Sequence, residues 1–408
     1  MKEQTETTEV GVEARFVGAV RTVAAAVKRE FAFSSCLLLH HNDADGIASG
    51  AILSAAFSRL GMRVSRYCLE KPFPAVVRRI VEDREERLLV VADFGSGMVS
   101  QFLALKHPEG RVLLLDHHQL EAGYRHQDPG CWVLNPLMLG MEAASAASAA
   151  TVCALFAEAL SDDNRDLSWL GVVGWQGDGQ RDQGLNAIVS SHAIAAGGLN
   201  KDVGDKVWRG DHPLRAIVEG VNALGAFDYL RGGPDIAMKG LLSDNIAGLL
   251  QMAERARQRY DEAFRSGQGV RVEQHPSGRL QSFFLGEAFA QFGVKTVGLV
   301  CEELIARGLV AADRYLVGFQ RVPDDIPGIG PVPLNQVKVS MRLPPGVARE
   351  VTEGRALPLT ELLPPAARQL GGFVDACHPH AAAVSIDEGQ ESELLERLAE
   401  IVSFGGRR

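Results

Sequence analysis

Short apolar runs alternate with helix-like patterns throughout the first half of the chain, and this alternation constrains the fold more than any other feature. We expect strands at residues 36–39, 63–68, 88–92 and 111–115, with helices between them at 46–59, 73–81 and 98–106. Strand and helix patterns that alternate in this way predict an α/β fold with a parallel, doubly wound sheet. In open sheets of this type, ligands bind beyond the carboxyl ends of the strands. The residues directly after these strands are therefore the first candidates for a functional site.

The second half of the chain predicts more helices, one of them long, followed by a smaller domain. Helices are expected at 143–160, 167–175 and 214–224, and the charged pattern at 245–267 ends at a glycine, as a helix between two domains would. Further strands are expected at 279–285, 296–300, 314–319, 337–342 and 381–386, with helices at 301–307 and 392–403. We therefore expect a first domain at 14–240, a connecting helix at 241–267 and a smaller α/β domain at 268–405.

The formal net charge of −9 limits how this chain can bind a polyanion. A nucleic acid would have to be held by a local basic groove or by bound cations, because the surface as a whole repels it. No apolar run approaches the roughly 20 residues that a membrane helix needs, and the first segment is polar, unlike a secretory signal. We expect a soluble, cytoplasmic protein with no membrane partner.

Acidic and histidine residues gather at the ends of the expected strands. His41, Asp43 and Asp45 follow the first strand, and alternate residues of an extended segment point the same way. A helix cap would explain Asp45 equally well, and a lone aspartate such as Asp93, after the third strand, is more often a cap or loop residue. Asp178 follows an apolar helix and is a weak signal by itself.

The run Asp116-His117-His118 directly follows the apolar strand expected at 111–115. Three adjacent groups that can bind metal or protons are difficult to explain as packing, because burying them unpaired is costly. With the other clusters, the run supplies carboxylate and imidazole ligands, which suit manganese or magnesium better than the thiolate-rich sites of structural zinc. Two such ions about 3.5–4 Å apart can activate a water and neutralise phosphoryl oxygens. The set therefore predicts phosphodiester hydrolysis.

Five segments carry these clusters: HNDADGI at 41–47, VVADFGSG at 90–97, LLLDHH at 113–118, NPLMLG at 135–140 and GWQGD at 174–178. In this order they resemble the DHH phosphoesterase superfamily, and within it the archaeal-type RecJ-like single-strand exonucleases. VKVSMR at 337–342 and CHPHAAA at 377–383 are similar to the DHH-associated C-terminal domain. The resemblance implies a catalytic DHH domain at 14–240 and a DHH-associated, substrate-binding domain at 268–405.

The resemblance also implies roles for individual residues. It implies ligands for two divalent cations, manganese first and magnesium second: His41, Asp43, Asp45, Asp93, His117 and Asp178. Asp93 would bridge the two ions. His118 would contact the scissile phosphate or assist the leaving oxygen, while Asp116 would orient its neighbours.

Candidate substrate contacts lie in the second domain. Lys338 and Arg342 are four residues apart on one expected strand, so they lie on the same face. The resemblance favours Arg342 as a phosphate ligand, whereas Lys338 is equally well explained as part of a solvated strand face. His378 is a further candidate, although the family's Gly-Gly-His is replaced here by Asp-Ala-Cys at 375–377 before His378. Since the glycines let backbone approach the substrate, this departure leaves the binding geometry open.

Three functions remain open from the sequence. The leading one is a manganese-dependent exonuclease acting on single-stranded DNA or RNA, the partner that we expect. The second is a phosphodiesterase for very short oligonucleotides or cyclic dinucleotides, which the acidic charge favours, because a long single strand needs a basic, aromatic-lined groove. The third is a replication or repair scaffold that kept the fold and lost the chemistry. Such a scaffold is expected to lose metal ligands, and here the set is intact. A homodimer is left open.

Overall fold

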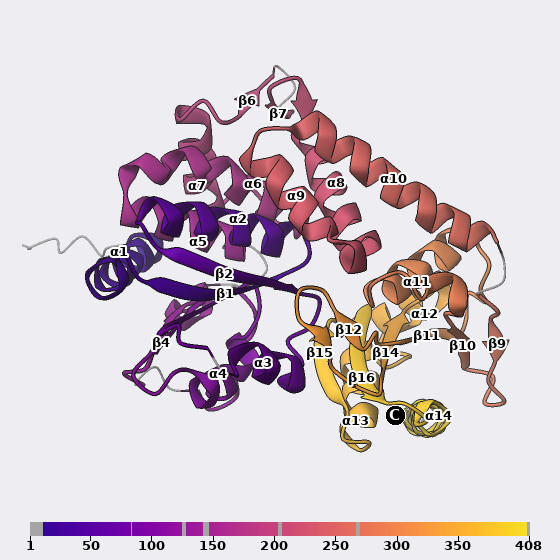
Figure 1. Cartoon of the computed structure of the whole chain (residues 1–408). Helices are drawn as coiled ribbons and strands as arrows, with labels where there is room; N and C mark the ends of the chain where they lie inside the picture. Colours follow the sequence, from indigo (N-terminus) through magenta and orange to yellow (C-terminus); the bar gives the residue numbers. More distant parts are fainter. Residues whose placement is uncertain are drawn as a thin grey trace, which may run out of the picture. The chain divides into compact units, whose positions relative to one another are not determined.

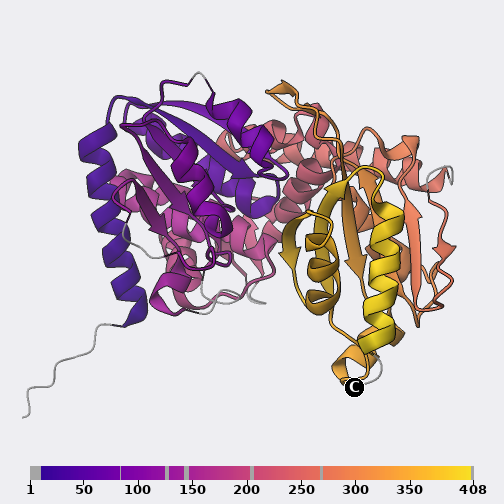
Figure 2. The ribbon, with the colours of Figure 1, turned by 90° about the horizontal axis from the view of Figure 1, so that it is seen from below.

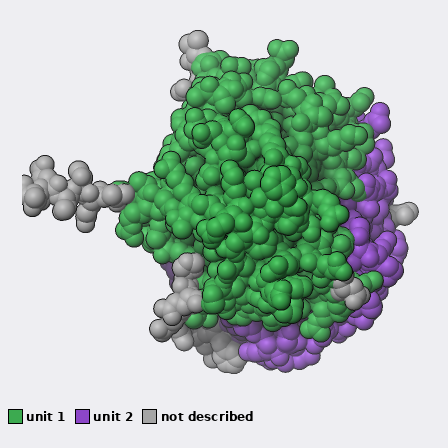
Figure 3. Space-filling view, turned by 60° about the vertical axis from the view of Figure 1, so that its left-hand side comes forward, with its two compact units in different colours: residues 1–225, 232–254 green, residues 226–231, 255–408 purple. Residues whose placement is uncertain are grey.

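A computed structural model describes residues 11–82, 84–124, 128–141, 147–202, 206–266 and 270–405 of the 408-residue chain. The chain divides into two compact units, which are coloured green and purple in Figure 3. The first unit holds residues 1–225 and 232–254, and the second holds 226–231 and 255–408. Helix α10 (Ile246–Arg265) begins in the first unit and ends in the second, in the region where the sequence predicts a connecting helix.

Within the described ranges, five parallel strands form the main sheet of the first unit, in the order β2-β1-β3-β4-β5. The strands are β1 (Ser35–His41), β2 (Arg63–Leu69), β3 (Leu88–Ala92), β4 (Arg111–Leu115) and β5 (Cys131–Leu134). Every residue of β3 is buried, because helices cover the sheet on both faces, and this explains its unbroken apolar sequence. The predicted parallel α/β fold is confirmed, whereas β5 has no counterpart among the predicted strands.

Helices lie on both faces of this sheet (Figure 1, Figure 2). On one face lie α2 (Ala44–Arg59) and α5 (Ala149–Leu160), and on the other lie α3 (Pro74–Val81) and α4 (Val99–Leu105). Helix α5 packs against α1, α2 and α6, so it is apolar around most of its circumference. The unit also contains α1 (Val12–Phe31), α6 (Ser168–Gly177), α7 (Gly184–Ala195), β6 (Asn200–Lys201), β7 (Val207–Arg209), β8 (His212–Pro213), α9 (Gly233–Leu242) and all of α8 (Leu214–Phe227) except its last two residues.

The second unit contains a mixed sheet in the order β15-β16-β14-β11-β10-β9 among the residues described. Its strands are β9 (Glu273–Gln274), β10 (Leu280–Phe284), β11 (Tyr315–Arg321), β14 (Gln336–Arg342), β15 (Phe373–Cys377) and β16 (Ala381–Asp387), and β12 (Asp325–Ile326) pairs separately with β13 (Gly330–Pro331). Its helices in the described ranges are α11 (Thr296–Ala306), α12 (Pro345–Thr352), α13 (Leu359–Arg368) and α14 (Glu391–Gly405). Separate apolar cores, one containing Leu363 and Leu398 and the other Val300 and Phe289, account for the stability of this smaller unit.

One predicted strand of the second unit is wrong. Residues 296–300 include the β-branched Thr296, Val297 and Val300, but they form the first turn and a half of helix α11. Val297, Val300, Cys301 and Leu304 are all buried, which is the spacing of one helix face, and no turn residue separates 300 from 301.

None of the helices in the described ranges is both long and apolar enough to cross a membrane.

Candidate metal centre

The carboxyl ends of three neighbouring strands meet at one edge of the parallel sheet. Strand β1 ends at His41, and its residue His40 is paired in register with Ala92, the last residue of β3. Ala92 is paired in turn with Leu115, the last residue of β4. The segments that begin at Asn42, Asp93 and Asp116 therefore leave the sheet side by side. This register brings together residues that are distant from one another in the sequence.

The first group of possible metal ligands is formed by His41, Asp43 and Asp93. The Nδ1 atom of His41 lies 2.8 Å from Oδ2 of Asp43 and 3.3 Å from Oδ2 of Asp93. Each residue offers one ligand atom, and these atoms lie within 4.8 Å of one another. Asp43 also caps helix α2, because its Oδ1 accepts a hydrogen bond from the backbone N–H of Gly46 at 3.0 Å. The cap fixes the position of the carboxylate beside His41.

The second group surrounds His117. Three carboxylate oxygens face its Nε2 atom: Asp178 Oδ2 at 3.1 Å, Asp93 Oδ1 at 3.6 Å and Asp45 Oδ2 at 3.8 Å. Asp93 thus directs one oxygen toward His41 and the other toward His117. A carboxylate in this position can bridge two metal ions.

Asp45 is held by the N-terminus of helix α5. Its two oxygens accept the backbone N–H groups of Ala149 and Ala150, each at 2.8 Å, and its side chain is fully buried. Burial, followed by the negative charge of Asp178, raises the pKa of Asp45 to about 7. Gly174 makes room for this arrangement, since a Cβ atom there would lie 2.3 Å from Oδ1 of Asp45.

Asp93 combines an uncommon backbone with an unfavourable charge. Its φ angle of 64° places it in the left-handed region, which aspartate tolerates better than most residues. The residue is only 2% exposed, and burial together with the charges of Asp43 and Asp45 raises its pKa well above the usual value. Buried carboxylates this close to one another need protons or cations to offset their charge. The donor set, which contains oxygen and imidazole nitrogen, fits manganese or magnesium.

Asp116 supports the loop that carries the two histidines. Its Oδ1 accepts the backbone N–H groups of His117 at 2.8 Å and His118 at 3.2 Å, and it lies 2.7 Å from Nδ1 of His118. Its Oδ2 accepts the N–H of Ser96 at 2.9 Å. Burial alone would raise the pKa of Asp116, but His118 and these hydrogen bonds lower it well below the usual range. Asp116 therefore stays ionised, while the side chain of His118 is half exposed.

Several polar residues that support the site were not among the predicted site residues. Asn135 donates from Nδ2 to the carbonyl oxygen of His118 and to Oγ of Ser96, both at 2.8 Å. Gln180 lies 3.3 Å from Nδ1 of His117 and is bonded to the buried Asn186. Asn135 stands in the NPLMLG segment, to which the sequence assigns no role, and Gln180 lies two residues beyond the predicted ligand Asp178. The only sign of these roles in the sequence is that Asn135 and Gln180 lie in or beside segments that carry predicted ligands.

The predicted substrate contacts all lie in the second unit. The Nε atom of Arg342 donates to Glu302 at 2.9 Å. Arg342 is paired with Ala381 across β14 and β16, and the backbone N–H of His378 donates to the carbonyl of Ala381 at 2.8 Å. Arg342 and the exposed His378 therefore belong to the same end of this sheet. The solvated-face explanation of Lys338 is wrong, because Lys338 is only 3% exposed within the sheet.

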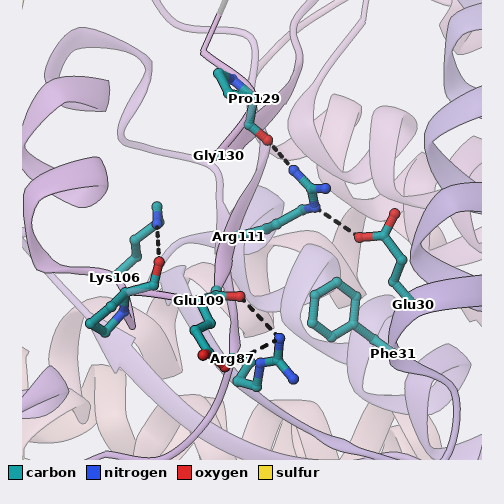
Figure 4. A pocket seen from close by; sticks show the side chains of 10 residues that line it. Glu30, Phe31, Arg87, Lys106, Glu109, Arg111, Pro129 and Gly130 are labelled. Atoms are coloured by element: carbon teal, nitrogen blue, oxygen red, sulfur yellow. Dashed lines mark hydrogen bonds and ion pairs between the residues drawn. The ribbon is translucent and has the colours of Figure 1, made fainter.

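A separate pocket of about 440 Å³ lies at the opposite, amino edge of the first sheet (Figure 4). Figure 4 shows its charged side chains already engaged with groups of the protein. Arg111 donates to Glu30 at 2.8 Å, Arg87 lies 3.7 Å from Glu109, and Lys106 donates to backbone carbonyls. The pocket therefore offers no concentrated charge comparable to the carboxyl edge.

Comparisons with known proteins find relatives of part of the chain. Residues 35–171 match the family described as the DHH family, N-terminal domain. An uncharacterized protein of Methanocaldococcus jannaschii is 29% identical over 160 residues, which cover 38% of this chain and 36% of that protein. The match thus spans about a third of the length of this curated relative.

Solved structures share the fold over nearly the whole chain. RecJ from Thermus thermophilus in complex with Mn²⁺ has a TM-score of 0.62 and 17% identity, covering 95% of this chain and 55% of that one. The exonuclease RecJ bound to manganese has a TM-score of 0.58 and 16% identity, covering 96% of this chain and 95% of that one. At these identities the likeness shows the fold alone.

Proposed function

We propose that this chain, a member of the DHH superfamily whose residues 35–171 form the DHH-family N-terminal domain, is a two-metal phosphodiester hydrolase. One observation carries the proposal: the two oxygens of the buried Asp93 face His41 on one side and His117 on the other. A structural aspartate would gain nothing from a left-handed backbone and a raised pKa. A bridging metal ligand accounts for both features.

The ligand groups would divide between two divalent cations. One group is His41 with Asp43, the other is His117 with Asp45 and Asp178, and Asp93 is common to both. Bound there, the cations would make a water nucleophilic and offset the negative charge of the phosphoryl oxygens. The rigid attachments of Asp43 to helix α2 and of Asp45 to helix α5 preorganise the ligands.

In this proposal His118 acts on the leaving oxygen. Burial favours its neutral form, but the adjacent Asp116 carboxylate outweighs burial and raises the pKa of His118. The ring is held through Nδ1 by Asp116, and its half-exposed side chain leaves Nε2 available for a substrate. A protonated His118 can therefore donate a proton from Nε2 to the departing oxygen.

The proposed substrate is an end of single-stranded DNA or RNA, with manganese as the metal. The support is the manganese-bound exonuclease RecJ, whose fold covers both units. Arg342 and His378 at one end of the second sheet offer a cationic and an exposed imidazole group to the phosphates. Very short oligonucleotides remain the second candidate, because the net charge of −9 disfavours long polyanions.

One panel of substrates separates these candidates. Labelled oligonucleotides of both sugars and of graded length, each labelled at either end, and a cyclic dinucleotide are incubated with the protein and Mn²⁺. Rates that persist on long single strands support the exonuclease, and rates that peak at dinucleotides support the short-substrate enzyme. Asp93→Asn serves as the control, since it must be inactive on every substrate. Hydrolysis of none of them by the wild type would favour a scaffold.

A further inference from the structure

Two side-chain amides, the buried Asn186 and the partly buried Gln180, lead from backbone groups to the Nδ1 atom of His117. This amide chain begins at Asn186, which is fully buried. The Oδ1 atom of Asn186 accepts the backbone N–H of Ser148 at 3.3 Å and the hydroxyl of Thr151 at 2.6 Å. Its Nδ2 donates to the carbonyl of Arg181 at 3.1 Å. Because backbone groups can only donate or only accept, they fix which end of the Asn186 amide points in each direction.

Gln180 is the next amide, and its orientation is fixed in the same way. Its Oε1 accepts from Nδ2 of Asn186 at 2.9 Å, and its Nε2 donates to the carbonyl of Ala147 at 3.3 Å. The same Nε2 lies 3.3 Å from Nδ1 of His117. Gln180 therefore presents a hydrogen-bond donor to the ring nitrogen that faces away from the carboxylates.

A hydrogen-bond donor beside Nδ1 is the opposite of the partner that a metal-bound histidine normally has there. A histidine that binds a metal through Nε2 donates its Nδ1–H to a carboxylate, a carbonyl or a water. Rotating the amide of Gln180 by 180° would supply an acceptor. The rotation would, however, place Nε2 against the donor of Asn186 and Oε1 against the carbonyl of Ala147. The amide chain therefore resists the rearrangement.

We infer that Gln180 is a positioning residue that acts through His117 and keeps the affinity of this subsite for a divalent cation low. The inference rests on the proposed function, because it takes the Nε2 atom of His117 as a metal ligand. A weakly held second cation would exchange with the surroundings. The occupancy of the centre would then follow the free concentration of the cation.

Gln180→Glu tests the inference directly. A carboxylate at this position accepts from Asn186 as before and also accepts the Nδ1–H of His117, while the carbonyl of Ala147 loses its donor. We expect Mn²⁺ to bind the His117 subsite about tenfold more tightly, the lower end of the range for such supporting residues. The measurement is calorimetric titration of the metal-stripped full chain with Mn²⁺, with free Mn²⁺ followed by electron paramagnetic resonance. An unchanged or weaker affinity would overturn the inference.

Two further variants separate the hydrogen bond to His117 from a simple effect of charge. Gln183→Glu adds the same charge to an exposed side chain three residues away, so it controls for long-range attraction, which salt also screens. An equal gain in Gln183→Glu contradicts a role for the hydrogen bond. Gln180→Met removes the donor without adding charge, and we expect an affinity no lower than that of the wild type. A tenfold loss in Gln180→Met would show that Gln180 supports the metal, which is the opposite of the inference.

The outcome also separates this inference from the proposed function. If the wild type binds Mn²⁺ at two sites and Gln180→Glu leaves both affinities unchanged, the inference alone fails. If the wild type binds no Mn²⁺, the proposed function and the inference fail together. A tighter subsite in Gln180→Glu, with Asp93→Asn unable to bind, supports both.

Discussion

The Nδ1 atom of His118 lies 2.7 Å from Oδ1 of Asp116, and that same oxygen accepts two backbone N–H groups of the loop. Asp116 is fully buried while His118 is half exposed, so the pair connects the interior of the sheet with the surface where a substrate would lie. The carboxylate sets both the direction of the ring and its charge. Replacing it should therefore alter a proton-dependent step more than metal binding.

Asp116→Asn should shift the pH dependence of turnover. The pKa of His118 is raised in the folded protein by Asp116, so its protonated form persists to higher pH. If that form protonates the leaving oxygen, turnover falls as pH rises through this pKa. Removing the carboxylate lowers the pKa, so the alkaline limb of kcat against pH should move to lower pH. His118→Gln should remove the limb altogether, and an unmoved limb in Asp116→Asn would contradict the role of His118.

Asp93→Asn should abolish metal binding without unfolding the protein. Asparagine tolerates the left-handed φ of 64° as well as aspartate does, so the backbone is kept. Because changes in residues that merely support a ligand cost about 10- to 100-fold in affinity, losing the bridge should cost more than about 100-fold. Calorimetric titration with Mn²⁺ measures the loss. The metal-free variant should also melt above the metal-free wild type, since a buried aspartate here must either carry a crowded charge or take up a proton, and asparagine does neither.

The metal-free protein should lose stability as pH rises from about 4 to 7. Asp45 has a folded pKa of about 7, above its unfolded value of about 3.9, so the folded state binds more protons between these values. Its contribution is fully present below the unfolded pKa and is lost as pH rises through the folded one. Thermal unfolding in chelator at several pH values tests this. Asp45→Asn should flatten the profile, and a stability that rises between about pH 4 and pH 7 would contradict the assigned pKa.

Gly174→Ala should displace the carboxylate of Asp45 and so weaken metal binding. The new methyl group would lie 2.3 Å from Oδ1 of Asp45 and 2.3 Å from Cβ of Ala150, so the carboxylate of Asp45 and the start of helix α5 must shift. We expect at least a tenfold loss of Mn²⁺ affinity and a destabilisation of about 1–3 kcal/mol, the usual result of overpacking. Gly18→Ala in helix α1 is the control, since its Cβ would meet nothing within 4 Å. That control should be neutral or stabilising, by up to about 1 kcal/mol.

Arg342→Ala should weaken substrate binding more than chemistry. Arg342 lies in the second unit and has no place among the metal ligands, so KM on an oligonucleotide should rise by about tenfold or more while kcat changes little. A nitrophenyl phosphodiester with no further phosphates should show no such change. Arg307→Ala, which removes an exposed arginine paired with Glu303, is the matched control. An equal loss on both substrates would indicate a structural role for Arg342.

The sequence predicts the parallel sheet and the residues at its edge for one physical reason. Buried parallel strands are continuous apolar runs. The first charged residue after each run, Asp93 after β3 and Asp116 after β4, therefore marks the end of the strand in the sequence. Strand register then brings those ends together without further information. The first half of helix α11 was predicted as a strand because Thr296 and Val297 have strand propensity, and only their packing decides otherwise.

The supporting residues could not be predicted in the same way. The roles of Gln180 and Asn186 come from hydrogen bonds to groups that are distant in the sequence, such as Nδ1 of His117. A glutamine in a polar loop carries no pattern that separates such a role from solvation. The burial of Lys338 was missed for a related reason, since alternation along one strand does not tell which face is covered.

The attachment of Asp45 to helix α5 has a consequence for how the centre can be observed. The amide hydrogens of Ala149 and Ala150 are held by a carboxylate that also faces the proposed cation, and both lie in the first turn of a buried helix. Any ion that binds to the oxygens of Asp45 changes the protection of these two amides against hydrogen exchange. Their hydrogen-exchange rates are therefore a readout of occupancy that requires neither a substrate nor turnover.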